Sequence, residues 1–402
     1  MIKNLFFLSI ALLLLFFGGC KALQVNKLLN QGNAPAGNFL SVVPFDYEKK
    51  IPIIKVDIRG KMYNFILDTG APCVISTALY EEMNLKSAAD VKVSDSNNKN
   101  ENADFAVVDS IQVGGVNFTE MLAVVPDLRA NDGMACLDID GIIGANLMRT
   151  AFWEIDYAKT ELRLTNDLSN FSDAGEKVVI NFTRKNSGTP VLDLNVNGTE
   201  IKAVTFDTGS TGYVSLPLRY FPGAAADDTQ TKRGYGELSY GVHGAGSADT
   251  SYYLRVDKWQ AGEMTESGKI IEAEKIDKRP VGNRFMENYR VVLDWKTDKI
   301  TLYPRPNREK ENEKIENLGF LLALQDDIFR VSYLYADSEA EKQGLRIGDL
   351  VTEINGQPVA NMTASQRCTF IIGFARNYAQ VRLKVVRDSE EFELTLMRRE
   401  WF

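Results

Sequence analysis

The chain has 402 residues, of which 45% are hydrophobic, and its 54 acidic and 46 basic side chains give a net charge of −8 at pH 7. This length allows two or three domains with hydrophobic cores of their own. A negative net charge argues against a nucleic-acid partner, since nucleic acids are bound by clustered basic side chains. No glycine-rich phosphate-binding loop stands out, so a nucleotide-dependent enzyme is not indicated.

Residues 1–20 have the composition of a targeting segment. An apolar run, Leu5–Phe17, follows one positive charge and is too short to span a bilayer comfortably. It ends at Gly18-Gly19-Cys20, which resembles the signal of bacterial lipoproteins. The resemblance implies lipidation of Cys20 and attachment to a membrane of the cell envelope, at the periplasmic face or the cell surface. An ordinary signal peptide or a membrane anchor is the alternative, because phenylalanine replaces the usual leucine three residues before the cysteine. Residues 21–39 are polar, contain glycine and proline, and predict a tether.

The sequence Asp-Thr-Gly occurs twice, each time after an apolar segment that predicts a strand. Tyr63–Leu67 precedes Asp68-Thr69-Gly70, and Ile201–Phe206 precedes Asp207-Thr208-Gly209. Glycine can adopt the positive φ that a tight turn requires, so each aspartate is predicted to lie at the end of a rigid strand. A single sequence of this kind is usually only a strand-to-turn junction. A repeated one needs a further explanation.

Other features recur at nearly the spacing of the two aspartates, which is 139 residues (207 − 68). Ile143-Gly144 follows Asp68 by 76 residues (144 − 68), and Val281-Gly282 follows Asp207 by 75 (282 − 207). The hairpin pattern of residues 153–164 also recurs at residues 291–302. The chain therefore contains a duplicated unit.

The duplication suggests how the two aspartates could work together. Two tandem copies can pack about an approximate two-fold axis, which brings Asp68 and Asp207 face to face. Two carboxylates a few ångströms apart do not both ionise cheaply, so the pair holds one proton, and one acts as base while the other acts as acid. Such a pair can activate a water molecule for attack on a peptide carbonyl.

Over residues 40–304 the chain resembles the aspartic proteases of the pepsin and retropepsin kind. The resemblance rests on the motifs Phe65–Gly70 and Val204–Ser210. It also rests on Ile142–Gly144, which matches a hydrophobic-hydrophobic-glycine sequence that packs beneath the motif in this family. The corresponding Pro280–Gly282 matches that sequence less well.

This resemblance implies a mainly β fold with two β-barrel lobes related by pseudo-two-fold symmetry, lobe 1 at residues 40–170 and lobe 2 at residues 171–304. It implies that Asp68 and Asp207 share the lytic water and that the two motif threonines brace the pair through their hydroxyl groups. It implies neither a cofactor nor a metal. The residues that would support catalysis are Thr69, Gly70, Thr208, Gly209 and Ser210.

The fourth motif position differs between the lobes, with Ala71 in one and Ser210 in the other. A serine hydroxyl at this position can donate a hydrogen bond to the adjacent carboxylate and favour its charged form. We therefore expect Asp68 to hold the shared proton more often than Asp207.

Each half also contains a stretch that is placed to cover a bound peptide. These stretches are residues 91–102, which are polar, and residues 233–248, which are rich in glycine and tyrosine. Tips of this kind on projecting hairpins can close over a cleft and exclude water. Tyr235 and Tyr240 are the candidate substrate contacts. The alternative is that both stretches are long surface loops.

Cysteine and histidine are scarce. If Cys20 is lipidated, Cys73, Cys136 and Cys368 remain, and an odd number cannot all pair within the chain. Cys73 and Cys136 lie in the same predicted lobe and could form a disulfide, and buried free thiols are the alternative. The single histidine, His243, lies in a glycine-rich stretch, and we interpret it as a solvated loop residue. Triads that need histidine and multi-histidine metal sites are therefore disfavoured.

Residues 305–317 are charged, contain proline and predict a linker. Residues 318–402 resemble a PDZ domain, a small α+β fold, through Ala340–Asp349 and Ile354–Val359. In that family a Gly-Phe loop offers backbone N–H groups to a peptide carboxylate, and the neighbouring strand edge pairs with the peptide. The resemblance implies that Leu318-Gly319-Phe320 is this loop. A domain that serves only for packing is the alternative.

The sequence thus predicts a monomeric, lipid-anchored protein of the bacterial cell envelope. It would act as an aspartic endopeptidase on peptide or protein substrates, with a PDZ domain that recruits or positions peptide. The alternative is a lipoprotein that keeps the protease fold and only binds peptide, as a scaffold. Both aspartates and both threonines favour the enzyme, whereas the imperfect match at Pro280–Gly282 and the unclear first-lobe cover favour the binding protein. Assembly from two molecules, as in single-lobe retropepsins, is disfavoured because one chain holds both halves.

Overall fold

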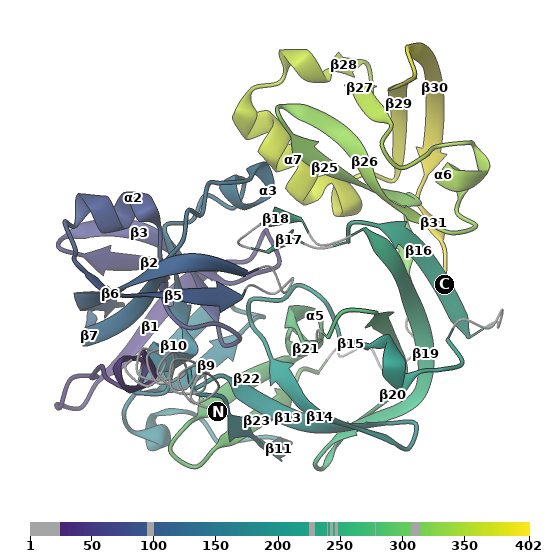
Figure 1. Ribbon diagram of the computed structural model, residues 1–402. Helices are drawn as coiled ribbons and strands as arrows, with labels where there is room; N and C mark the ends of the chain where they lie inside the picture. The colour runs from purple at the N-terminus through teal and green to yellow at the C-terminus, as the bar shows by residue number, and fades with distance from the viewer. Residues whose placement is uncertain are drawn as a thin grey trace, which may run out of the picture.

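The computed structural model describes residues 25–94, 100–224, 230–238, 240–241, 244–245, 248–277, 279–306 and 314–402. The predicted targeting segment with Cys20 lies outside these residues, and so does His243. Within them, no helix combines the length and hydrophobicity that are needed to span a bilayer. The fold is mainly β, as predicted, and its strands form two large sheets and two small ones. Figure 1 shows lobe 1, lobe 2 and a C-terminal domain (residues 314–402).

Lobe 1 contains a closed barrel. Its six strands follow one another in the order β2-β3-β8-β4-β7-β6, and a further pairing of β2 with β6 closes the ring. β3 and β8 run parallel, and the other long strands form antiparallel pairs whose buried and exposed side chains alternate. The elements of lobe 1 are β1 (Leu40–Asp46), β2 (Ile53–Ile58), β3 (Lys61–Asp68), β4 (Val74–Ile75), α2 (Thr77–Glu82), β5 (Ser87–Ser94), β6 (Asn100–Val113), β7 (Val116–Val125), α3 (Asp132–Ala135), β8 (Gly141–Gly144), α4 (Ala145–Met148), β9 (Phe152–Asp156), β10 (Glu161–Thr165) and the short 3₁₀ helix η1 (Leu168–Asn170).

Lobe 2 repeats this ring with less regular pairing. Its order is β13-β14-β21, then β15-β20-β19 and back to β13, and a single bridge between Val214 and Val281 joins the two halves of the ring. The elements of lobe 2 are β11 (Val178–Asn181), β12 (Thr183–Arg184), β13 (Pro190–Val196), β14 (Thr199–Phe206), β15 (Ser215–Pro217), η2 (Leu218–Tyr220), β16 (Thr231–Gly236), β17 (Tyr240–Gly241), β18 (Gly244–Ala245), β19 (Asp249–Ala261), β20 (Met264–Glu274), β21 (Pro280–Val281), α5 (Asn283–Met286), β22 (Tyr289–Asp294) and β23 (Lys299–Pro304).

The two copies meet where the repeated hairpins lie side by side. β9 and β22 pair antiparallel, with Val291 opposite Ile155 and Leu293 opposite Trp153. In the repeat, Val291 corresponds to Trp153 and Leu293 to Ile155, so the two pairs exchange equivalent positions. A pairing that is complementary to itself in this way is the signature of a two-fold axis. The axis passes between β9 and β22.

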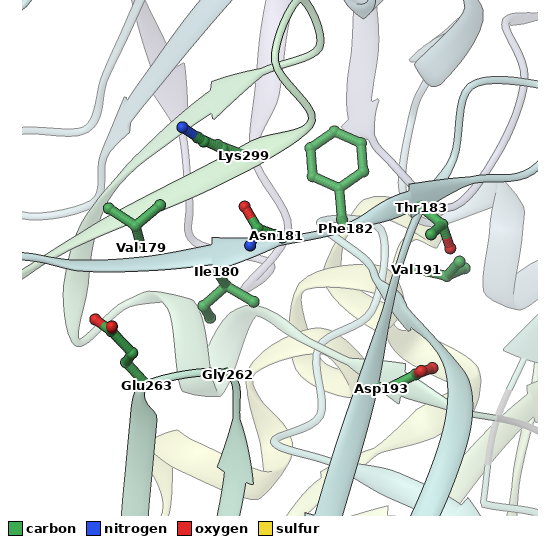
Figure 2. A pocket seen from close by; sticks show the side chains of 10 residues that line it. All are labelled: Val179, Ile180, Asn181, Phe182, Thr183, Val191, Asp193, Gly262, Glu263 and Lys299. Atoms are coloured by element: carbon green, nitrogen blue, oxygen red, sulfur yellow. The ribbon is translucent and has the colours of Figure 1, made fainter.

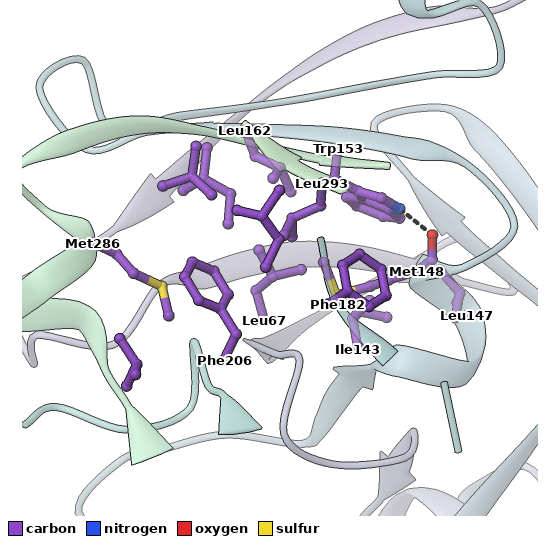
Figure 3. Packing of buried hydrophobic residues seen from close by; sticks show 14 of the residues in the cluster. Leu67, Ile143, Leu147, Met148, Trp153, Leu162, Phe182, Phe206, Met286 and Leu293 are labelled. Carbon is purple, nitrogen blue, oxygen red and sulfur yellow. Dashed lines mark hydrogen bonds between the residues drawn. The ribbon is translucent and has the colours of Figure 1, made fainter. Parts of the chain in front are cut away.

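One hydrophobic core lies under this axis and includes residues of both lobes. Leu67 and Phe206, which precede the two aspartates, are fully buried in it, as are Trp153 and Leu293 from the paired hairpins. Figure 3 shows these side chains together with the Trp153 indole N–H, which donates to the carbonyl of Met148 at 2.6 Å. Deleting one such large side chain from a close-packed core costs about 2–5 kcal/mol. The strand ends that carry the aspartates are therefore held rigidly from below.

The C-terminal domain has a core of its own. Its long helix, α7, begins at a capping box, in which the Thr363 hydroxyl accepts from the Gln366 N–H and the Gln366 side chain accepts from the Thr363 N–H. The elements are β24 (Glu316–Asn317), β25 (Phe320–Gln325), β26 (Ile328–Tyr335), α6 (Glu339–Lys342), β27 (Leu350–Ile354), β28 (Gln357–Pro358), η3 (Val359–Asn361), α7 (Ala364–Asn377), β29 (Gln380–Arg387), β30 (Glu390–Met397) and β31 (Arg399–Glu400).

The C-terminal domain shares a sheet with lobe 2. β26 pairs antiparallel with β16, with Gly234 opposite Tyr335 and Gly236 opposite Tyr333. Both glycines are needed for this close approach, since a Cβ on Gly234 would meet the Tyr333 ring and one on Gly236 would collide with the Ser332 carbonyl. Trp401, near the end of the chain, is buried against Tyr253 and donates from its indole N–H to the Ala336 carbonyl at 2.7 Å.

A disulfide connects the C-terminal domain to lobe 1, and this pairing was not among the alternatives that the sequence left open. Cys136 pairs with Cys368, with 5.0 Å between their Cα atoms, and it does not pair with Cys73. Cys73 is a buried free thiol, and its sulfur accepts a hydrogen bond from the Gly144 N–H at 3.4 Å. Cys136 instead caps the C-terminal end of α3 and is buried among core residues of the C-terminal domain. Spacing along the chain did not reveal this pairing, because the two cysteines are 232 residues apart.

Candidate active site

The two predicted aspartates lie at equivalent strand ends. Asp68 is the last residue of β3 and pairs with Gly144 of the parallel strand β8. Asp207 follows β14 directly, and its N–H donates to the carbonyl of Val281 in the parallel strand β21 at 2.9 Å. Pro280–Gly282 therefore occupies the same place as Ile142–Gly144, although its sequence matches the expected pattern less well.

The two motif threonines exchange hydrogen bonds across the axis. The Thr69 N–H donates to the Thr208 hydroxyl oxygen at 3.0 Å, and the Thr208 N–H donates to the Thr69 hydroxyl oxygen at 3.0 Å. Each hydroxyl in turn donates to a carbonyl of the other lobe, Thr208 to Leu67 at 2.8 Å and Thr69 to Phe206. Both side chains are completely buried. This network fixes the two strand ends relative to each other, because each buried bond costs about 1–3 kcal/mol to break.

Each carboxylate lies over the motif glycine of the opposite lobe. A Cβ on Gly70 would lie 2.7 Å from the Asp207 carboxylate carbon, and a Cβ on Gly209 would collide with the Asp68 carboxylate. The Gly70 N–H donates to Asp68 at 2.7 Å, and the Gly209 N–H donates to Asp207 at 2.9 Å. The two side chains are also within hydrogen-bonding reach of each other. The structure thus brings Asp68 and Asp207 together, as the repeat predicted.

The pair is asymmetric in its affinity for a proton. The pKa of Asp207 is raised well above its ordinary value, first by desolvation and then by the negative charge of Asp68. Desolvation also raises the pKa of Asp68, but the backbone N–H groups of Gly70 and Ala71 oppose this rise. Both carboxylates nevertheless keep part of their surface exposed. Both shifts favour a pair that holds one proton in common, and the pKa of Asp207 is the more strongly raised of the two.

The stronger rise at Asp207 does not follow our expectation that Asp68 holds the proton more often, and because a coupled pair titrates as one unit that expectation stays a prediction. The Ser210 hydroxyl is turned toward Gly282, where a Cβ would lie 3.0 Å from its oxygen. No hydrogen bond from that hydroxyl to Asp207 is found among the described residues. The difference between the lobes arises instead from Asp68, which the Ala71 N–H helps to stabilise in its charged form.

Two buried asparagines hold the motif loops and were not recognised in the sequence. Asn283 donates from its amide to the carbonyls of Thr208 at 2.7 Å and Ser210 at 2.9 Å, and it accepts from the Tyr157 hydroxyl of lobe 1 at 2.6 Å. In lobe 1, Asn146 accepts from the Cys73 N–H at 2.7 Å. A polar residue shortly after the hydrophobic-glycine sequence in both halves is the signal that could have identified them.

Lys185 is a charged neighbour of the pair that the sequence analysis also missed. It begins the turn before β13, and its ammonium group donates to the Thr205 hydroxyl at 3.1 Å, two residues before Asp207. Its positive charge lowers the pKa of Asp207, although less than desolvation raises it. Partial desolvation in turn lowers the pKa of Lys185, and the charge of Asp207 opposes this change.

The two predicted covers have different surroundings. The first coincides with the hairpin of β5 and β6, whose tip at residues 95–99 lies outside the described residues. In the second, Tyr235 pairs with Thr250 of β19 and with Leu334 of β26, so the base of this cover belongs to the sheet shared with the C-terminal domain. Tyr240 begins β17. The side chain of Tyr240 lies outside the described part of the structure.

The predicted peptide-binding loop, Leu318-Gly319-Phe320, leads into β25. Gly319 has a φ of 92° and donates from its N–H to the Asn317 side chain at 2.9 Å. Leu318 and Phe320 are buried. The loop is packed against α6, because a Cβ on Gly319 would lie 2.7 Å from the Ser338 hydroxyl oxygen. Only glycine fits this position.

A hollow of about 600 Å³ lies elsewhere, on lobe 2. Figure 2 shows its lining, which comes from β11, β12, β13, the turn between β19 and β20, and Lys299. No member of the aspartate pair or the threonine network borders it. Among the described residues, no group of three or more histidine, cysteine or acidic side chains is placed to hold a metal ion.

Two segments of the chain match models of known families. Residues 54–147 match the family model described as aspartyl protease, and residues 330–387 match the model described as PDZ domain. The first match includes Asp68 and ends in α4, and the second extends from β26 to the end of β29. A search of curated proteins found no match.

Proposed function

Because the chain carries an aspartyl protease domain and a PDZ domain, we propose that it is an aspartic endopeptidase whose active site is the pair Asp68 and Asp207. The observation that carries this proposal is the reciprocal threonine network, which joins the two strand ends so that the carboxylates face each other. A purely structural junction of two lobes does not require two carboxylates at its solvent-accessible centre, where they repel each other.

In the proposed mechanism, a water molecule is held between the two carboxyl groups. Charged Asp68 removes a proton from this water as its oxygen attacks the peptide carbonyl carbon, and Asp207 donates its proton to the carbonyl oxygen. The result is a gem-diol, which carries the hydroxyl group of the water and the proton from Asp207, while Asp68 holds the other proton of the water. Asp68 then passes its proton to the amide nitrogen as the C–N bond breaks, and a diol proton returns to Asp207. The pair ends the cycle with one proton, as it began.

A cleavage assay tests this proposal. Wild-type protein and the variants Asp68→Asn and Asp207→Asn are incubated with a mixed peptide library from acid to neutral pH, and products are identified by mass spectrometry. We expect cleavage by the wild type and a loss of about 10²–10⁴-fold in each variant, since general acid–base catalysis contributes that much. A wild-type protein that retains peptides without cleaving them would support a binding protein instead.

We further propose that residues 1–20 are a lipoprotein signal and that Cys20 is lipidated. The sequence Gly18-Gly19-Cys20 after an apolar run supports this assignment. Labelling of the expressed protein with a radioactive fatty acid should mark the wild type and not Cys20→Ala. Equal labelling of both proteins would contradict the assignment.

A further inference from the structure

The C-terminal domain has an unpaired strand edge at β25 beside α7, and we call this edge with the facing side of α7 the groove. Within the described part of the chain, β25 pairs with β26 alone, so its other edge faces α7. Aromatic contacts fix the helix beside the strand, with ring centroids 5.0 Å apart for Phe320 and Phe374 and 5.2 Å apart for Phe329 and Phe370. An open strand edge beside a helix is the kind of surface that an extended peptide can join.

A segment of lobe 1 already contacts this groove. α3 lies against β25, and the Asp132 carboxylate accepts a hydrogen bond from the Asp326 N–H, at the end of β25, at 2.9 Å. Cys136, which caps α3, is only 5% exposed and packs among the core side chains of the C-terminal domain. Figure 1 shows α3 reaching from lobe 1 to the underside of α7. We call residues 131–136 the clasp segment.

The disulfide fixes the clasp segment at the second turn of the helix. Cys368 is the fifth residue of α7, between Thr363, which caps its start, and Phe374, which contacts Phe320 near the start of β25. At the other end of the groove, Arg367 forms an ion pair with Asp327 in the turn after β25. The sulfur of Cys136 therefore enters the domain between the two ends of the groove, where a side chain of a bound peptide would have to pack.

We propose that the clasp segment is a built-in occupant of the groove and that the Cys136–Cys368 disulfide keeps a competing peptide out. A dithiol reductant would release it by two exchange steps. One thiolate attacks a sulfur of the disulfide to form a mixed disulfide, and the second thiol then displaces the protein thiol, so that two cysteine thiols and one oxidised dithiol result. After reduction the clasp segment is still part of the same chain. It then competes with free peptide for the groove only through its effective concentration, which is finite.

The Cys136–Cys368 disulfide also affects how the two lobes are connected. The C-terminal domain shares a sheet with lobe 2 through β16 and β26, while its covalent link to lobe 1 is the disulfide. The disulfide therefore completes a bridge from lobe 1 through the C-terminal domain to lobe 2. A peptide that displaces the clasp segment would break this link and form its own contacts with the C-terminal domain. The inference does not depend on peptide hydrolysis by Asp68 and Asp207.

Binding to a displayed library of C-terminal decapeptides tests the proposal on the full chain. The arms are the oxidised wild type, the wild type reduced with dithiothreitol, Cys136→Ser, and the control Cys73→Ser, which removes the buried thiol that is outside the disulfide. Asp68→Asn is included in every arm so that the peptides are not cleaved. We expect the reduced wild type and Cys136→Ser to retain a common set of peptides at least tenfold more tightly than the oxidised wild type and Cys73→Ser.

Two results would overturn the proposal. One is equal binding by the oxidised wild type and Cys136→Ser, and the other is the absence of peptide binding in all arms. Hydrogen exchange provides a second measurement that does not need a ligand, and Cys368→Ser serves if Cys136→Ser does not fold. The amides of β25 and residues 131–136 should exchange faster after reduction, whereas unchanged exchange would show that the disulfide does not hold the segment in place.

Discussion

The two lobes carry the same motif in different surroundings. Comparing them separates the features that both aspartates share from those that differ between the two carboxyl groups. The strand ends, the threonine exchange and the glycine contacts occur in both lobes. The proton affinity of the two carboxylates does not follow this symmetry, because Asp68 is stabilised by two N–H groups and Asp207 is more strongly affected by its neighbour's charge. A symmetric backbone can therefore hold an acid and a base.

The lobes also differ in how they meet the C-terminal domain. Lobe 2 contributes β16 to a shared sheet, with Tyr253 and Trp401 in edge-to-face contact behind it. Lobe 1 meets the domain through the clasp segment, in which one hydrogen bond and one disulfide supplement apolar packing. One attachment is thus part of the fold, while the other contains a bond that a reductant can break.

The strongest way to break the symmetry of the pair is to add a methyl group to one motif glycine. Gly209→Ala should displace the Asp68 carboxylate, since a Cβ at residue 209 would collide with it. We expect a fall in kcat/KM of about 10²-fold, the size of effect that a misplacement of about 1 Å produces. Gly223→Ala is the control, because a Cβ there meets no atom within 4 Å. Equal activity of the two variants would contradict the close approach of Gly209 to Asp68.

The threonine network can be tested one lobe at a time. Thr208→Val keeps the side-chain shape but leaves the Leu67 carbonyl and the Thr69 N–H without their partner. The free energy of unfolding should fall by about 1–3 kcal/mol in urea titrations. Thr69→Val should cost a similar amount, and the double variant should cost less than the two single losses combined, because the two residues share bonds. Thr183→Val, at an exposed position of β12, is the control, and an equal loss there would show that the network is not responsible.

The raised pKa of Asp207 predicts how stability depends on pH. A carboxyl group whose pKa is higher in the folded protein than in the unfolded chain binds its proton more tightly when folded. Its contribution to stability is complete below the unfolded pKa and is lost as the pH rises through the folded pKa. Asp207→Asn removes this loss, so it should raise the melting temperature of the protein at pH 7 more than at pH 4. Lowered stability at both pH values would mean that charged Asp207 is stabilised in the fold.

The smallest expected effect concerns Lys185. Its charge lowers the pKa of Asp207, so Lys185→Met should raise that pKa and move the alkaline limb of the activity profile to higher pH. We expect a shift of only roughly half a unit, because solvent screens the charge of this exposed side chain. Lys202→Met, which removes an exposed lysine paired with Glu200, should leave the profile unchanged. A shift toward lower pH in Lys185→Met would contradict the assigned direction.

The repeat was sufficient to predict that the aspartates meet, and the family resemblance carried by its motifs predicted the fold. Periodic apolar strands, Asp-Thr-Gly and the hydrophobic-glycine sequence each recur at one spacing. Pro280–Gly282 shows that the spacing was more informative than the residue types, since it pairs with β14 despite its weaker match. The aspartyl protease and PDZ resemblances were confirmed by the family matches.

What could not be predicted depends on how distant parts of the chain meet. The partner of Cys136 could not be predicted, because Cys368 lies 232 residues away in another domain. The location of the shared proton stays a prediction, because it depends on the direction of the Ser210 hydroxyl, which the turn near Gly282 decides. Asn283 was missed because its partners are backbone carbonyls and a tyrosine of the other lobe.

The central claim is that Asp68 and Asp207 act as one catalytic unit, and a comparison of four proteins tests it most directly. The rate of cleavage of one library-derived peptide is measured for the wild type, Asp68→Asn, Asp207→Asn and the double variant. The account predicts that each single variant loses as much activity as the double variant, because residues that act as a unit are not additive. Losses that multiply, or a single variant that keeps most of the wild-type rate, would contradict the shared site.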